Sequence, residues 1–151
     1  MSSADVGVSW EAFVADSPEL AERVQARFAT NLHHVIGTVR PSGAPRLSGT
    51  EVAIGTDRVT LGMMPGSLKL TDVRRDPRVE IHSAPLEDDL ASGDAKLTGR
   101  LMELDDTDRE PAGAGWFELA LQRVSLVRVE GDELVLVSWE PGRGQRTTCR
   151  R

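Results

Sequence analysis

Apolar residues recur at every fourth position near the start of the chain, a period typical of a helix with one buried face. Leu20, Val24 and Phe28 form one apolar stripe, and the charged residues between them lie largely off it. Ser17-Pro18-Glu19 is a strong helix start, because it offers a serine cap, a proline at the first helical position and an acid near the positive end of the dipole. With a shorter helix expected just before it, we predict an N-terminal helical segment over residues 1–31.

From residue 33 onward apolar and polar residues alternate, which is typical of β-strands. Turns rich in glycine, proline and aspartate separate the runs, no strand–helix–strand spacing repeats, and residues 112–115 are expected to be flexible. Strands are predicted over residues 34–39, 46–54, 58–63, 79–82, 94–104, 124–129 and 133–139. We therefore expect a mainly β fold: an antiparallel β-barrel with flanking helices, closed or nearly so, in a single domain over residues 1–151.

The stretch that follows the third predicted strand is the most informative part of the chain. After a Pro-Gly turn, a polar helix is expected to open at Ser67 with Lys69 in its first turn, although it has too few apolar residues to be buried. Free N–H groups at a helix start, a hydroxyl and an ammonium together suit a phosphate. A lysine in a first turn is also unfavourable against the helix dipole unless an anion is present. An ordinary exposed helix remains the alternative.

Two methionines precede this turn. Met63 and Met64 could stack against a flat apolar ring, because thioethers are polarizable and adaptable. Packing in the core is the alternative for methionines at a strand end. Gly62 beside them would let a ligand approach the backbone closely.

The charge of the chain narrows the classes of partner. Its 151 residues carry 18 basic and 24 acidic side chains, a formal net charge of −6, which disfavours a binder of nucleic acid or of anionic membranes. Acidic residues concentrate in Glu87-Asp88-Asp89 and from Glu103 to Glu110, which we interpret as solvated loops. No apolar run approaches the ~20 residues of a membrane span, and the first residues lack the basic start of a secretory signal. We expect a cytoplasmic protein.

Several common sites are disfavoured by the motifs. Neither a Gly-x-x-x-x-Gly-Lys-Ser/Thr loop nor a strand-linked Gly-x-Gly-x-x-Gly occurs. Cys149 is the only cysteine, so an internal disulfide and a cysteine-rich zinc site are excluded. His33 and His34 are adjacent in a predicted strand, so their rings point to opposite faces and cannot share a metal. A cluster of these with His82 lacks a supporting carboxylate spacing, and we expect no metal site.

Four short segments of the chain, taken in their order along the sequence, form a recognisable pattern. They are GTVRPSGAPRLS at residues 37–48, SLK at 67–69 with RDPRV at 75–79, KLTGR at 96–100 and WEPGRG at 139–144. In this order they resemble the pyridoxamine 5′-phosphate oxidase-related, FMN-binding split-barrel family, and in particular its actinobacterial-type flavin/deazaflavin oxidoreductase branch. The resemblance covers nearly all of the chain from Trp10 onward. It implies a six-stranded antiparallel Greek-key split barrel, FMN as cofactor, and a homodimer with the flavin at its interface.

The resemblance also implies nine cofactor-binding positions. An arginine and main-chain groups of the second strand face the flavin, and two methionines flank its ring. A serine and a lysine hold its phosphate, while a late tryptophan and arginine reach it from the partner subunit. In this chain these positions are Arg46, Leu47, Ser48, Met63, Met64, Ser67, Lys69, Trp139 and Arg146. No side chain stands out as a catalytic acid or base.

Three departures argue against a true pyridoxamine phosphate oxidase. The family's arginine before the lysine is Leu68 here, and its glutamine early in the strand from Asp94 is replaced by Ala95. The closing Arg-Leu-His reads Arg146-Thr147-Thr148. The groups that bind the vitamin's phosphate therefore look absent. What the resemblance implies is an FMN-dependent oxidoreductase acting on a small molecule whose identity stays open.

Two alternatives to FMN chemistry stay open at this point. A deazaflavin-dependent reductase needs more basic groups for the longer polyanionic tail of its cofactor. The candidates are Arg40, Arg58, Arg74 and Arg75. A non-catalytic flavin- or haem-binding protein, or one that has lost its cofactor, is the other alternative. A haem site would need His34 or His82 facing a pocket.

Overall fold

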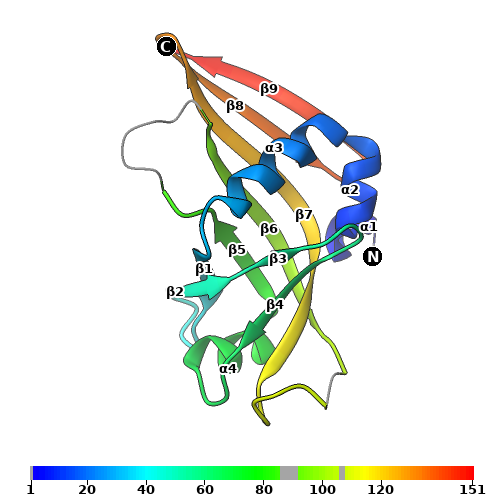
Figure 1. The fold of residues 1–151 in the computed structure, drawn as a ribbon, viewed down its shortest axis with the longest axis vertical. Coiled ribbons are helices and arrows are strands. Elements are labelled where there is room, and N and C mark those ends of the chain that lie inside the picture. Colours follow the sequence, from blue (N-terminus) through cyan, green and yellow to red (C-terminus); the bar gives the residue numbers. More distant parts are fainter. Residues whose placement is uncertain (1, 86–91, 106–107) are drawn as a thin grey trace.

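Four helices and nine strands form in this computed structural model, which describes residues 2–85, 92–105 and 108–151 (Figure 1). The helices are α1 (Ser3–Val6), α2 (Trp10–Asp16), α3 (Pro18–Ala29) and α4 (Leu68–Arg75). The strands are β1 (His33–Val39), β2 (Pro45–Glu51), β3 (Ala53–Ile54), β4 (Val59–Met63), β5 (Arg78–His82), β6 (Asp94–Glu103), β7 (Gly115–Glu130), β8 (Glu133–Glu140) and β9 (Gly144–Arg150). The predicted mainly β, antiparallel class is confirmed.

One antiparallel sheet contains all of these strands. Its main path runs β2-β1-β5-β6-β7-β4-β3, with β8 paired to β7 and β9 paired to β8. Only Val52 separates β2 from β3, so this segment runs first along β1 and then along β4. Among the described strands no ladder joins β2 to β4. The barrel therefore stays open along the line between β2 and β4, which we call the open seam.

The sheet differs from the expected six-stranded, closed or nearly closed barrel. β7 is one strand of 16 residues, whose first part pairs with β4 and whose last part pairs with β8. It begins at Gly115, inside the stretch expected to be flexible, because main-chain bonds to β4 order this glycine. β9 was not expected, because its residues are polar and exposed. Its pairing with β8 is made by the main chain and leaves no hydrophobic pattern in the sequence.

Helices α2 and α3 lie across β7 and β8, where they cover one face of the sheet (Figure 1). The predicted stripe of Leu20, Val24 and Phe28 is buried there, so the helical prediction is confirmed. Trp10 and Phe13 of α2 are buried beside it, with their ring centroids 5.2 Å apart. These aromatic rings give the small barrel much of the apolar volume of its core.

Ser17 precedes α3 as predicted, but its hydroxyl has another partner. The Oγ atom of Ser17 donates to Oε1 of Gln145 on β9 at 2.6 Å. In the described structure it therefore makes no side-chain cap on α3. The bond joins residues 128 positions apart in the chain and ties the start of α3 to the C-terminal strand.

Helix α4 is short and polar, yet Leu70, Asp72 and Val73 are buried. The expectation that this helix is too polar to be buried is wrong for this face. Asp72 explains how a polar helix can pack. Its Oδ2 accepts hydrogen bonds from Thr38 Oγ1 on β1 at 2.8 Å and from Arg46 Nε on β2 at 2.7 Å. These bonds hold α4 beside the open seam.

The acidic stretches are only partly within the described residues. Glu87-Asp88-Asp89 lies outside them, as do residues 106 and 107 of the second stretch. Glu103, at the start of the second stretch, is paired rather than simply solvated, because Arg74 donates to its carboxylate at 2.6 Å. Across the described ranges, none of the helices has the length and apolar character needed to span a lipid bilayer.

Candidate cofactor site

A cavity of about 340 Å³ lies at the open seam, lined by the end of β2, the end of β4, the start of β7 and Lys69 of α4. A shallower hollow of about 400 Å³ adjoins it and shares Gly49 and Lys69 with it. Seven of the nine predicted residues line one or both of these spaces. They are Arg46, Leu47, Ser48, Met63, Met64, Ser67 and Lys69. The fold therefore brings together residues from β2, β4 and α4 that are up to 23 positions apart.

Ser67 and Lys69 provide the strongest signs of an anion site. Ser67 occupies the N-cap position of α4, as predicted, but its buried Oγ has no hydrogen-bond partner among the described residues. Two residues later, Lys69 Nζ donates to the main-chain oxygen of Gly49 at 2.5 Å. Burial lowers the pKa of Lys69. An unpartnered hydroxyl and an ammonium bonded to a neutral carbonyl, at one helix start, fit a phosphate.

Arg46 lines the hollow, but Asp72 already uses part of its guanidinium. The pair is largely enclosed, with side chains 15% and 2% exposed, and Nε lies 2.7 Å from Oδ2. Burial by itself would raise the pKa of Asp72, but hydrogen bonds from Arg46 and Thr38 and the charges of Arg46 and Arg75 hold it below its ordinary value. Arg46 thus positions α4, and only its Nη groups remain for a ligand.

The two methionines lie in different environments. Met63 is 2% exposed and belongs to the core, which was the alternative interpretation of its position. Met64 is 64% exposed at the rim of the cavity. Of the two, Met64 is therefore the side chain that can lie against a bound ring.

Trp116, which the sequence analysis missed, forms a wall of the same cavity. It lies on β7 directly across from Gly62 of β4, and a Cβ added to Gly62 would come within 2.5 Å of the ring. The glycine therefore gives room to the tryptophan rather than to a ligand. The indole Nε1 is buried and makes no hydrogen bond to the described residues, while the Arg109 guanidinium carbon lies 4.6 Å from the ring centroid. In the sequence, Gly62 was the one sign that a bulky side chain packs here. That this side chain is Trp116 depends on the register of β4 and β7, which the sequence does not show.

Trp139 and Arg146 are not part of this cavity. Trp139 is 2% exposed, its ring packs 4.8 Å from that of Phe13, and its Nε1 donates to Asp16 Oδ2 at 2.7 Å. A ring enclosed in this way by its own subunit has no face left for a partner's flavin, so the prediction for Trp139 is wrong. Arg146 is exposed on β9, far from α4 (Figure 1), and its contact with a partner's flavin stays a prediction.

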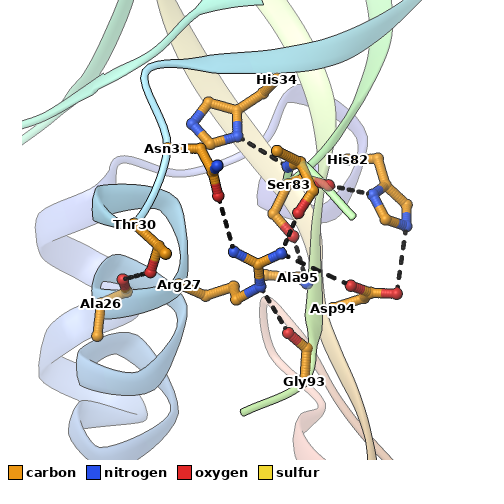
Figure 2. Close-up of polar contacts among 11 residues, drawn as sticks. Ala26, Arg27, Thr30, Asn31, His34, His82, Ser83, Gly93, Asp94 and Ala95 are labelled. Atoms are coloured by element: carbon orange, nitrogen blue, oxygen red, sulfur yellow. Dashed lines mark hydrogen bonds and ion pairs between the residues drawn. The ribbon is translucent and has the colours of Figure 1, made fainter. Parts of the chain in front are cut away.

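The histidines offer little support for a haem site. Figure 2 shows His34 and His82 within a polar cluster beside the end of α3. His34 is 3% exposed, and its Nδ1 accepts a hydrogen bond from the main-chain N–H of Ala84 at 3.0 Å. In His82, Nδ1 lies 2.5 Å from the main-chain oxygen of Ser83, and Nε2 lies 4.0 Å from the carboxylate of Asp94. Within the described ranges, no group of three histidine, cysteine or acidic residues could hold a metal ion.

The four arginines considered for a longer polyanionic tail are dispersed. Arg40 lines the hollow beside Lys69. Arg74 is bonded to a glutamate of β6, and Arg75 pairs with Asp72. Arg58 lines neither the cavity nor the hollow. The basic groups that surround the start of α4 therefore suit a single phosphate better than a polyanion.

Comparison with solved structures gives matches that share the fold and little of the sequence. PhzG from Burkholderia lata 383, in complex with tetrahydrophenazine-1-carboxylic acid, is 13% identical, with a TM-score of 0.68 over 100% of this chain and 96% of that one. A pyridoxamine 5′-phosphate oxidase-related, FMN binding protein from Nostoc punctiforme PCC 73102 is 11% identical, with a TM-score of 0.63 over 89% and 96% of the two chains. The fold is the split barrel that these two proteins share.

The same split barrel occurs in proteins that differ in what they bind. A heme binding protein from Mycobacterium smegmatis is 17% identical, with a TM-score of 0.59 over 83% of this chain and 57% of that one. The chain spans only 56%, 61% and 57% of the length of three matching structures. No family model and no curated protein matches the sequence. These likenesses establish the fold alone, because one fold supports many functions.

Proposed function

We propose that this protein is an FMN-dependent oxidoreductase of the pyridoxamine phosphate oxidase-like family, acting in the cytoplasm on a small molecule. The observation that carries the proposal is the buried Oγ of Ser67, which lacks a partner among the described residues, with the Lys69 ammonium two positions away. A buried hydroxyl without a partner destabilises the ligand-free protein, and a phosphate oxygen would satisfy it. The fold shared with the Nostoc FMN binding protein supports the same cofactor.

The start of α4 holds the phosphate in this proposal. Ser67 Oγ donates one hydrogen bond, and the first N–H groups of the helix supply further donors. Lys69 Nζ exchanges the carbonyl oxygen of Gly49 for a phosphate oxygen, so the same ammonium makes a stronger, charge-assisted bond. Arg46 lines the same hollow, and its ion pair with Asp72 keeps the side chain in place.

The cavity at the open seam receives the flat ring. Met64 and Trp116 supply apolar walls, and the end of β2, from Leu47 to Gly49, presents main-chain groups along one side. FMN supplies the hydride or electron transfer chemistry once bound. The side chains bind it, orient it and exclude water, and we assign none of them as an acid or base.

We further propose a homodimer with the cofactor at its interface. Three of the most exposed large apolar side chains, Leu47, Met64 and Leu68, surround the site, at 75%, 64% and 64% exposure. Exposed apolar side chains that gather in one place indicate an interaction surface. A second copy of the chain would cover them and would complete the walls of the cofactor site. Arg146 of that second copy is the residue that we expect to reach the flavin.

Titration of FMN into the apo protein tests this proposal, with Lys69→Ala and Lys96→Ala compared to wild type. Lys96 is the matched control, because it is the only other lysine and lines neither space of the site. We expect Lys69→Ala to weaken binding by about 1.5–3 kcal/mol, the range for hydrogen bonds to charged groups, and Lys96→Ala to leave it unchanged. Wild-type affinity should fall as salt rises. A chain that takes up no FMN, or an unchanged affinity in Lys69→Ala, would contradict the assignment.

The oxidoreductase part of the proposal needs a second measurement. A chemical reductant should bleach the absorption of the bound flavin, and the colour should return when air is admitted. A bound flavin that cannot be reduced would leave a flavin-binding protein without redox activity. A Soret band in the purified protein would instead support haem.

A further inference from the structure

A second hollow lies between α3 and the strands β7, β8 and β9. Helix α3 lies away from α4 in the fold (Figure 1). The volume of this hollow is about 210 Å³. Its floor is formed by three core side chains that are at most 6% exposed, Leu126 of β7, Val137 of β8 and Leu20 of α3. The rim is polar. It carries Glu19, Arg23, Arg128, Gln145 and Thr147. The polar rim belongs neither to the core nor to the proposed cofactor site.

Arg128 is the side chain that most needs explaining. It follows Leu126 by two positions on β7, so both side chains project from the same face of the sheet. The Arg128 side chain is only 15% exposed, and its Nη2 lies 3.5 Å from the Glu130 carboxylate. Its Nη1 is buried and has no hydrogen-bond partner in the described part of the chain. A buried guanidinium N–H without an acceptor is costly, so an acceptor bound in the hollow would stabilise the protein.

The other rim groups are mostly donors as well. Gln145 Oε1 accepts the hydrogen bond from Ser17, which orients the carboxamide and leaves its NH₂ group for a different acceptor. Thr147 lies across from Val137 in the ladder and adds a hydroxyl beside the floor. Arg23 adds a second cation, while Glu19, one helical turn earlier, is the one acid among the lining residues. The rim therefore favours a ligand that accepts hydrogen bonds and carries a single negative charge.

We propose that this hollow binds the carboxylate of a small monocarboxylic acid. The carboxylate accepts from Arg128 Nη1 and from the rim donors. Glu19 and Glu130 oppose a doubly charged anion, which favours a monocarboxylate over inorganic phosphate. The site shares no residue with the proposed cofactor site, so it stands independently of the proposed function.

Calorimetric titration with butyrate and with butyramide tests the proposal on the full chain. We expect saturable binding of one butyrate per chain. The affinity for the uncharged butyramide should be lower by about tenfold or more, since hydrogen bonds to charged groups are the stronger ones. Arg128→Gln should weaken butyrate binding by about tenfold or more. Arg123→Gln is the matched control, because it lies on the same strand and pairs with Glu140 at 3.8 Å, outside the hollow.

A second pair of variants keeps the test decisive if Arg128→Gln fails to fold. Thr147→Glu places a carboxylate at the exposed rim and should abolish butyrate binding, whereas Thr148→Glu points to the opposite face of β9 and should not. Lys69→Ala should bind butyrate as wild type does. Absent or unsaturable butyrate binding, equal binding of butyramide, or phosphate bound more tightly than butyrate would overturn the proposal.

Discussion

The Ser67 hydroxyl and the Lys69 ammonium belong to the same hollow but differ in their hydrogen bonding. Lys69 Nζ has the Gly49 carbonyl as its acceptor, whereas Ser67 Oγ is buried without a partner among the described residues. A buried polar group left unpaired costs about 1–3 kcal/mol. Stability and ligand binding should therefore respond in opposite directions when this hydroxyl is removed.

We accordingly predict that Ser67→Ala leaves the ligand-free protein as stable as wild type, or more stable, while FMN binding weakens by about 1 kcal/mol. Urea unfolding of the apo protein and FMN titration measure the two effects. A variant that loses apo stability would show that the hydroxyl has a structural partner instead.

Gly62 allows a second prediction at the residue scale. An alanine Cβ at this position would lie 2.5 Å from the Trp116 ring, so Gly62→Ala should destabilise the protein by about 1–3 kcal/mol, the usual range for overpacking. Gly49→Ala is the control, since nothing lies within 4 Å of its added Cβ. Urea unfolding of both variants checks the difference. Equal stabilities would mean that the ring moves aside freely.

These residues also show what the sequence could predict of the site. Ser67 and Lys69 belong to one helix start, so their chemistry is local and readable. The pairing of Gly62 with Trp116, and of Arg46 with Asp72, depends on strand register and helix placement over tens of residues. Trp139 was misassigned for the same reason, because its burial depends on α2 packing against the end of β8.

At the scale of elements, α4 owes its position to one buried carboxylate. Asp72 accepts hydrogen bonds from Thr38 and Arg46, and its pKa lies below its ordinary value near 3.8. A carboxyl whose folded-state pKa is lowered stabilises the fold above the unfolded value, and this contribution is lost as the pH falls through the folded value. Helix α4, and with it the proposed phosphate site, should therefore loosen in acid.

The prediction is that Asp72→Asn lowers the free energy of unfolding at neutral pH by about 3 kcal/mol, since it leaves the enclosed Arg46 without its counter-charge. It should also flatten the fall in stability below about pH 4, the range in which a carboxylate of ordinary pKa titrates. Denaturant titrations at several pH values measure both. An unchanged acid slope in the variant would mean that other carboxyls dominate it.

The C-terminal strand provides another prediction at this scale. β9 is paired with β8 along its length and is tied to α3 through Gln145, so deleting residues 143–151 should lower the stability of the apo protein substantially. The control changes four arginines to glutamine and keeps the strand. They are Arg143, Arg146, Arg150 and Arg151. Urea unfolding should separate the two variants, and weaker FMN binding in the control at unchanged stability would support the Arg146 prediction.

The elements themselves were largely readable from the sequence. Helix α3 and strands β1, β4, β5, β6 and β8 follow apolar periodicities that the structure confirms. β9 and the first part of β7 do not, because their order comes from main-chain bonds to neighbours rather than from burial of side chains. Polar edge strands carry no hydrophobic signal that a sequence alone could reveal.

For the whole molecule, the apolar side chains around the cofactor site predict association. We expect a twofold homodimer that buries on the order of 2,000 Å² or more, with Leu47, Met64 and Leu68 at its centre. Sedimentation at micromolar concentration checks the state, and Leu47→Glu should shift it toward the monomer. A wild-type monomer under these conditions would contradict both the interface and a cofactor site built by two subunits.

The open seam changes how a ligand reaches the interior. In most closed barrels an opening must be made by bending strands or by displacing a loop. Here β2 and β4 face each other across the cavity, and in the described structure no ladder joins them. The two strands can therefore separate slightly without breaking any main-chain hydrogen bond between them. Lys69 of α4 is hydrogen-bonded to the Gly49 carbonyl of β2 beside this opening, so a phosphate that bound this ammonium in its place would free the end of β2 from α4.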